Sequence, residues 1–180
     1  MMRVGLIGEN PNDTESIANL LSLKYNHQYI SVLKRRKGGQ LDNAKFTALL
    51  EIELRNNNFD LLIFIRDLDG FENEADKVRV REKWFAANKL HFKKDSLFLL
   101  NIHALESIFF SDIVSLNKIF NLKLNFSNPL SINNPKKELI RVTSERYKEN
   151  RAADYISKLD YNAVLKNYKP LKDIDNYLKV

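Results

Sequence analysis

The fold is decided by residues 60–70, which read DLLIFIRDLDG. The apolar run at 60–65 is continuous, and such runs are typical of strands that a parallel sheet buries on both faces. The carboxylates of Asp67 and Asp69 follow directly. We therefore expect a buried strand here that delivers acidic side chains at its carboxyl end.

Three more segments favour strands because they are apolar or alternate apolar with polar residues: residues 2–8, 28–34 and 96–102. Helical signals lie between the strands. They predict a helix capped at Asp13 or Thr14 that runs to about Tyr25, helices at 42–56 and 72–90, and a helix from about residue 104. The alternating order predicts an α/β fold with a mainly parallel four-stranded sheet and helices on both faces.

The composition of the sequence changes at Asn125. From there the chain is more polar, and Pro129 and Pro135 follow. Short polar helices are expected at residues 135–149, 151–159 and 171–179. We interpret residues 1–124 as an α/β domain. Residues 125–180 are interpreted as a basic helical C-terminal extension packed on that domain.

Composition excludes several kinds of chemistry. The 180 residues contain no cysteine, which excludes disulfides, thiolate zinc sites, iron–sulfur clusters and cysteine nucleophiles. With three histidines, a His-rich transition-metal site is not favoured either. No signal-peptide pattern opens the chain and no apolar run is long enough for a membrane helix, so we expect a cytoplasmic protein without a membrane partner.

The net charge of +6 is unevenly distributed. Residues 1–112 hold 16 basic and 16 acidic side chains, whereas residues 113–180 hold 13 and 7. A basic tail on a neutral body is compatible with nucleic acid as a partner, and equally with a solvated surface. The candidate nucleic-acid contacts are Lys34, Arg35, Arg36, Lys37, Lys136, Lys137, Arg141 and Arg146.

Acidic residues follow three of the four expected strands. Glu9 follows the first, Asp67 and Asp69 follow the third, and Glu106 follows the fourth. Ligands of open parallel sheets bind beyond the carboxyl ends of the strands, so these acids are expected at one edge. Asp67 and Asp69 are two residues apart, and in extended backbone both side chains would lean to the same side.

Such a cluster is typical of a site for a hard cation. Two carboxylates about 4 Å apart repel by roughly 4 kcal/mol at an effective dielectric near 20, so several together need a cation or large pKa shifts. Oxygen donors without Cys or His select Mg²⁺ or Mn²⁺. Each acid also has a purely structural explanation as a loop residue, a helix cap or a first-turn acid. Their convergence favours the metal site.

Two of these motifs resemble the TOPRIM domain, the metal-binding module of topoisomerases, primases and several nucleases. That family has a Glu in a Gly-Glu-Gly-like motif after its first strand and an Asp-x-Asp after its third. Here the corresponding residues are Gly8-Glu9-Asn10, with Asn10 in place of the usual glycine, and Asp67-Leu68-Asp69.

A third segment, HALESIFFSD at residues 103–112, is similar to a segment of small bacterial TOPRIM-like proteins of unknown function. Relatives of those proteins include the overcoming-lysogenization-defect (OLD) type nucleases of phage defence. Glu106 matches the second Glu of their Glu-Leu-Glu-Ala-Trp-Leu-Leu-Ala-Asp-like segment and Asp112 matches its closing Asp. Ala104 replaces the first Glu, which removes one carboxylate and leaves catalytic competence open.

The resemblance implies a small metal-dependent nuclease. Its catalytic residues would be Glu9, Asp67 and Asp69, which would bind one or two Mg²⁺ ions with Glu106 completing the site. Glu9 would alternatively act as general acid or base. Topoisomerase, primase and recombination-mediator members are set aside, because they need more chain or a cysteine zinc site. The choice of DNA or RNA, a partner ATPase and homo-oligomerisation stay open.

Two alternatives compete with the nuclease hypothesis. One is a non-catalytic nucleic-acid-binding protein that keeps the fold. The other is a receiver-like phosphoacceptor domain, which needs a fifth strand followed by a Lys that we do not find. The remaining notable side chains are interpreted as structural: His103, and the aromatic residues Trp84, Phe85, Tyr147 and Tyr155.

Overall fold

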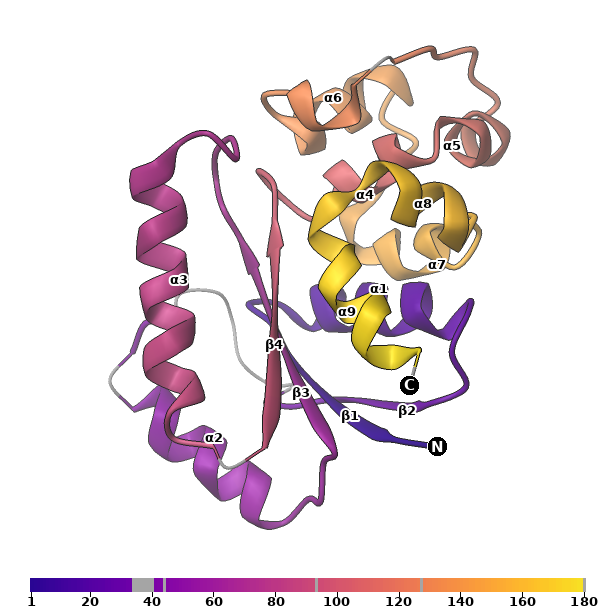
Figure 1. Ribbon diagram of the computed structural model, residues 1–180. Coiled ribbons are helices and arrows are strands. Elements are labelled where there is room, and N and C mark those ends of the chain that lie inside the picture. Colours follow the sequence, from indigo (N-terminus) through magenta and orange to yellow (C-terminus); the bar gives the residue numbers. More distant parts are fainter. Residues whose placement is uncertain (34–40, 44, 93, 127, 180) are drawn as a thin grey trace.

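The computed structural model describes residues 1–33, 41–43, 45–92, 94–126 and 128–179. It shows an α/β protein with a four-stranded, wholly parallel sheet (Figure 1). The strands are β1 (Arg3–Ile7), β2 (Gln28–Ser31), β3 (Leu61–Asp67) and β4 (Asp95–Asn101). They lie in the order β2-β1-β3-β4, so the apolar run of β3 is central. The expected parallel α/β sheet is confirmed.

Helices cover both faces of this sheet (Figure 1). The α-helices are α1 (Pro11–Ser22), α2 (Phe46–Arg55), α3 (Ala75–Lys89), α4 (Ser107–Ser111), α5 (Ile113–Phe120), α6 (Pro135–Val142), α7 (Ala152–Ile156), α8 (Tyr161–Asn167) and α9 (Lys172–Leu178). The described residues also contain the short 3-10 helices η1 (Pro129–Ser131), η2 (Glu149–Arg151) and η3 (Lys169–Leu171). Helices α2 and α3 pack on one face, and α1 with the C-terminal helices packs on the other.

The central strand β3 supplies both cores because side chains alternate between the two faces of a strand. Ile63 and Ile65 enter the larger core, on the side of α1. Leu62 and Phe64 enter the smaller one, on the side of α2 and α3. Of the aromatic residues interpreted as structural, Trp84 and Phe85 pack against the smaller core and Tyr147 and Tyr155 lie in the larger. That interpretation is confirmed.

The C-terminal helices share the larger core with the sheet. Leu139 of α6, Val164 of α8 and Ile174 of α9 are fully buried together with Ile63 of β3. Helix α7 also binds α1 directly, because the Asn19 side-chain amide donates a hydrogen bond to a main-chain carbonyl of α7. The C-terminal helices and α1 therefore cover the same face of the sheet.

Several element boundaries differ from the expected ones. Helix α1 is capped by Asn10 rather than by Asp13 or Thr14, since the Asn10 side chain accepts a hydrogen bond from the Asn12 amide. Helix α6 ends at Val142 instead of residue 149, because left-handed backbone at Ser144 and Glu145 turns the chain away. Helix α8 was not expected at all. Among the described residues, no helix is long and apolar enough to cross a membrane.

Candidate functional site

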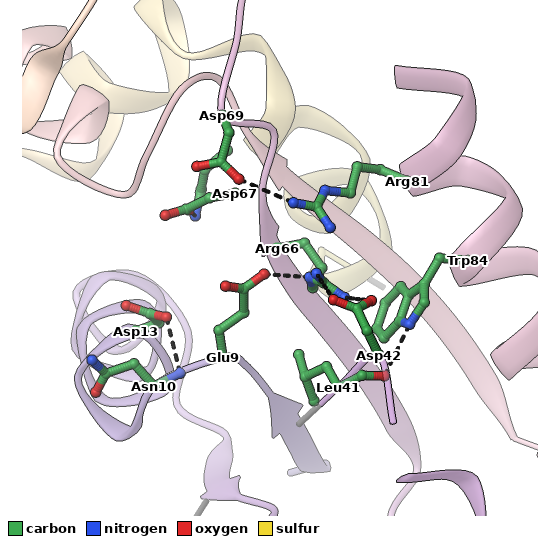
Figure 2. Close-up of polar contacts among 11 residues, drawn as sticks. Glu9, Asn10, Asp13, Leu41, Asp42, Arg66, Asp67, Asp69, Arg81 and Trp84 are labelled. Carbon is green, nitrogen blue, oxygen red and sulfur yellow. Dashed lines mark hydrogen bonds and ion pairs between the residues drawn. The ribbon is translucent and has the colours of Figure 1, made fainter. Parts of the chain in front are cut away.

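Carboxylates from four segments gather at the carboxyl edge of the sheet. Glu9 follows β1, Asp67 ends β3, Glu106 precedes α4, and Asp13 lies in the first turn of α1. The side chains of Glu9, Asp13 and Asp67 point into the same region (Figure 2). We call these four residues the acidic cluster. Three of its members were expected from the sequence, and Asp13 was not.

Asp67 lies at the centre of the acidic cluster. Burial raises the pKa of its carboxyl well above the ordinary value, and the charges of Asp13, Glu9 and Glu106 raise it further. The Asn101 amide donates a 3.0 Å hydrogen bond to Asp67, and the buried Tyr168 hydroxyl donates a 2.9 Å bond to Asn101. The position of Asp67 is therefore fixed by a buried chain of hydrogen bonds that reaches the C-terminal helices.

Asp13 is the member that sequence reasoning missed. Burial and the charges of Glu9 and Glu106 raise the pKa of its carboxyl to about 7. Its Oδ2 accepts a 3.1 Å hydrogen bond from the Asn10 main-chain amide, which completes a capping box with the Asn10 side chain. The three-residue spacing of Asn10 and Asp13 is a signal for the start of a helix. The same capping box holds the Asp13 carboxylate near the ends of the strands.

Glu106 is the fourth member of the acidic cluster. Glu106 is 5% exposed, and this burial raises the pKa of its carboxyl. The Tyr147 hydroxyl donates a 3.1 Å hydrogen bond to it. Burial disfavours the charged form of nearby Lys136, but the ion pair with Glu149 and the charges of Glu106 and Asp67 outweigh it and raise the Lys136 pKa.

A buried arginine holds Glu9. Arg66 of β3 is 2% exposed, and its Nε donates to Glu9 (Figure 2). The two terminal nitrogens donate to the two oxygens of Asp42 at 3.0 and 3.1 Å. The guanidinium also lies 4.6 Å from the centre of the Trp84 ring. The sequence contains one signal for this pairing, because Arg66 is a lone cation inside an apolar strand and a buried charge needs partners.

The backbone at Asp69 is not extended, so the premise from which the two side chains were expected to lean to the same side does not hold. Strand β3 ends at Asp67, and Asp69 has left-handed backbone with φ of 55° instead of extended backbone. Its Oδ2 accepts a 3.0 Å hydrogen bond from Arg81 of α3 (Figure 2). The His103 ring packs edge-to-face against the Phe71 ring, with 4.3 Å between the ring centres. This contact fits the structural role expected for His103.

The carboxylates are close enough to shift one another's pKa but are not arranged as a closed ligand shell. Among the described residues, no group of three or more His, Asp or Glu side chains stands ready to hold a metal ion. Separate partners occupy three of the expected acids: Arg66 binds Glu9, Tyr147 binds Glu106, and Arg81 binds Asp69.

The structure gives different outcomes for the predicted nucleic-acid contacts. Residues 34–37, which hold the four-residue basic run, lie outside the described residues. Lys136 pairs with Glu149 at 2.6 Å, and Arg141 makes two hydrogen bonds to Glu138. Arg146 donates from Nε to a main-chain carbonyl, and Lys137 is exposed. Two of the four tail cations are thus already neutralised by neighbouring acids.

A hollow of about 580 Å³ lies beside the acidic cluster. Asn10 and Asn12 line it from the start of α1, Lys136 from α6, and Tyr147 and Glu149 from the following segment. Three of its lining residues, Asn10, Lys136 and Tyr147, also contact or face members of the acidic cluster.

Searches of protein-family models, curated proteins and solved structures found no match to this chain.

Proposed function

We propose that this protein is a Mg²⁺- or Mn²⁺-dependent phosphodiester hydrolase of TOPRIM type that acts on nucleic acid. The supporting observation is the acidic cluster: carboxylates from four segments gather at the carboxyl edge of a parallel sheet, and Asp13, Asp67 and Glu106 all have raised pKa values. Raised pKa values mean that ionisation is costly there. A divalent cation would offset that cost.

The donor chemistry fits such an ion. All four side chains offer carboxylate oxygens, which are the ligands that Mg²⁺ and Mn²⁺ prefer. Asp67 and Glu9 would be the principal ligands, and Asp13 or Glu106 would complete the set. Asp69 is left out because Arg81 holds it. Binding would require Glu9 to give up its contact with Arg66, which keeps its second contact through Asp42.

When bound, the ion would activate a water molecule and stabilise charge on a scissile phosphate. The residues of the chain do the rest. Where Glu106 completes the ligand set, Asp13 would accept the proton that this water loses. Lys136 faces the cluster from α6 and would hold a phosphate oxygen of the substrate. Asn101 and Tyr168 fix the orientation of Asp67.

The test is cleavage of labelled DNA and RNA with Mg²⁺, with Mn²⁺ and with chelator. We expect Asp67→Asn to lower the cleavage rate by at least about 100-fold, as loss of a central electrostatic contact does. Asp76→Asn is the matched control, because Asp76 is an exposed acid that pairs with Arg79. Divalent-dependent cleavage that survives Asp67→Asn combined with Glu9→Gln would exclude this mechanism.

A second candidate function is non-catalytic binding of nucleic acid. Two observations favour it: Glu9 is already neutralised by Arg66, and Ala104 stands where the resembling proteins carry a Glu. Salt-dependent binding without cleavage under any divalent condition would identify this function.

A further inference from the structure

A second concave surface, separate from the acidic cluster, lies at the same edge of the sheet. It is a groove of about 870 Å³ between the loop after β3, the end of β4, and the segment that joins α8 to α9. Lys166, Lys169 and Lys172 line it, together with Phe71 and Asn73. We call it the lysine groove.

The lysine groove carries uncompensated positive charge. Lys169 lies 3.9 Å from Glu72, and both side chains are more than 60% exposed, so this pair is weak. Lys166 and Lys172 are exposed, and no carboxylate of the described residues lies within ion-pair distance of either. Three ammonium groups around one concave surface with one acid favour an anionic ligand.

The groove also contains an aromatic surface. Phe71 is half-buried, and the edge-to-face contact with the His103 ring at 4.3 Å holds it in place. Asn128 lines the groove as well, and its side-chain oxygen is occupied because it accepts a hydrogen bond from Leu130. Its amide group is left to donate. The groove therefore combines cations that can bind phosphates, a ring on which a base can stack and an amide that can donate a hydrogen bond to the edge of a base.

We infer that the lysine groove binds a single-stranded segment of nucleic acid. Grooves that hold single strands combine backbone-tracking cations with aromatic side chains on which bases stack. Proteins that read a duplex insert a helix or a ribbon into its groove. Here the protein is the concave partner, and a volume near 870 Å³ suits a few nucleotides of one strand.

The groove adjoins the chain of hydrogen bonds that fixes Asp67. Lys169 and Asn167 flank Tyr168, which binds Asn101, and Asn101 binds Asp67. Ile102, the next residue after Asn101, is part of the groove wall. A strand held by the lysines therefore lies along the same sheet edge as the acidic cluster. This inference rests on the proposed action on nucleic acid and names its substrate class.

The test is fluorescence anisotropy with labelled single-stranded DNA, single-stranded RNA and duplex DNA of equal length, all in chelator. Lys166→Glu with Lys172→Glu should weaken single-strand binding by about tenfold or more, and the salt dependence of log affinity should fall by about 0.7 per lost phosphate contact. Phe71→Leu should weaken binding by about tenfold through lost stacking. Lys118→Glu with Lys158→Glu is the control, because it makes the same charge change at exposed sites outside the groove.

Equal affinity of the groove variant and the control would overturn the inference. A duplex that binds as tightly as the single strand and responds to the same variants would overturn the single-strand assignment. Groove binding by the unaltered protein without cleavage under any divalent condition refutes the hydrolase alone. Cleavage that persists in the lysine variant with unchanged affinity refutes the groove alone.

Discussion

At the residue scale, Asp13 gives the clearest pH dependence. Its pKa is raised to about 7, so between the ordinary carboxyl range and pH 7 the folded state binds a proton that the unfolded state has lost. Stability therefore falls as pH rises through this window on account of Asp13. Asp13→Asn removes the charge and keeps an oxygen that can accept the capping hydrogen bond.

We expect Asp13→Asn to have little effect on unfolding free energy near pH 4, close to the ordinary carboxyl pKa of 3.8, where the unfolded state still binds much of its proton. Near pH 8 it should stabilise the protein by about 2 kcal/mol, a value discounted for the partial exposure of the carboxyl. Urea unfolding at the two pH values without divalent ions measures this. An equal difference at both pH values would contradict the raised pKa.

Arg66 gives a second prediction at this scale. Arg66→Met leaves Glu9 and Asp42 without their cation at the sheet edge, and we expect a loss of about 2–3 kcal/mol in unfolding free energy. Arg79→Met is the matched control, because the pair of Arg79 with Asp76 is exposed and should contribute less than about 1 kcal/mol. Chemical denaturation compares the two variants, and similar losses in both would show that burial gives Arg66 no special role.

At the element scale, the start of α1 ties helix formation to the site. Asn10 caps α1 and Asn134 caps α6 in the same way, each accepting a hydrogen bond from a main-chain amide. Replacing either cap with Ala should cost about 1 kcal/mol of stability. Only Asn10→Ala should also move the pKa of Asp13 back toward its ordinary value, because a frayed first turn exposes that carboxyl.

Carboxyl titration by NMR in both cap variants measures this difference. An Asp13 titration that is the same in Asn10→Ala as in the unaltered protein would show that the helix start does not position the acid. Unfolding experiments on the same two variants give the matched stability change.

The elements themselves were predicted unevenly. Strands β1, β3 and β4 were found because apolar runs are a local signal, whereas β2 is shorter than the expected 28–34. Helix α8 was missed although Asp160 caps it by accepting hydrogen bonds from two main-chain amides. The segment has only seven residues, and a helix this short is not stable until neighbouring helices supply a partner face for its apolar side.

At the scale of the whole molecule, the C-terminal helices are joined to the sheet by buried polar contacts as well as by the shared core. Asp175 of α9 accepts hydrogen bonds from Lys24, Tyr25 and Tyr161, and its pKa is lowered because those hydrogen bonds and the ion pair with Lys179 outweigh burial. Tyr168 links the same helices to Asp67 through Asn101. The C-terminal third therefore both covers the sheet and orients the acidic cluster.

The parallel sheet and the edge at which the acids gather follow from the amino-acid sequence alone. Strand direction fixes that edge, and residues 60–70 contain both the apolar run and the acids that follow it. Only the tertiary structure decided which carboxylates meet: Asp13 joins Asp67, Asp69 turns to Arg81, and Glu9 pairs with Arg66. The direction of a side chain beyond a strand end depends on backbone angles and on cations brought in from distant segments, and local sequence patterns encode neither.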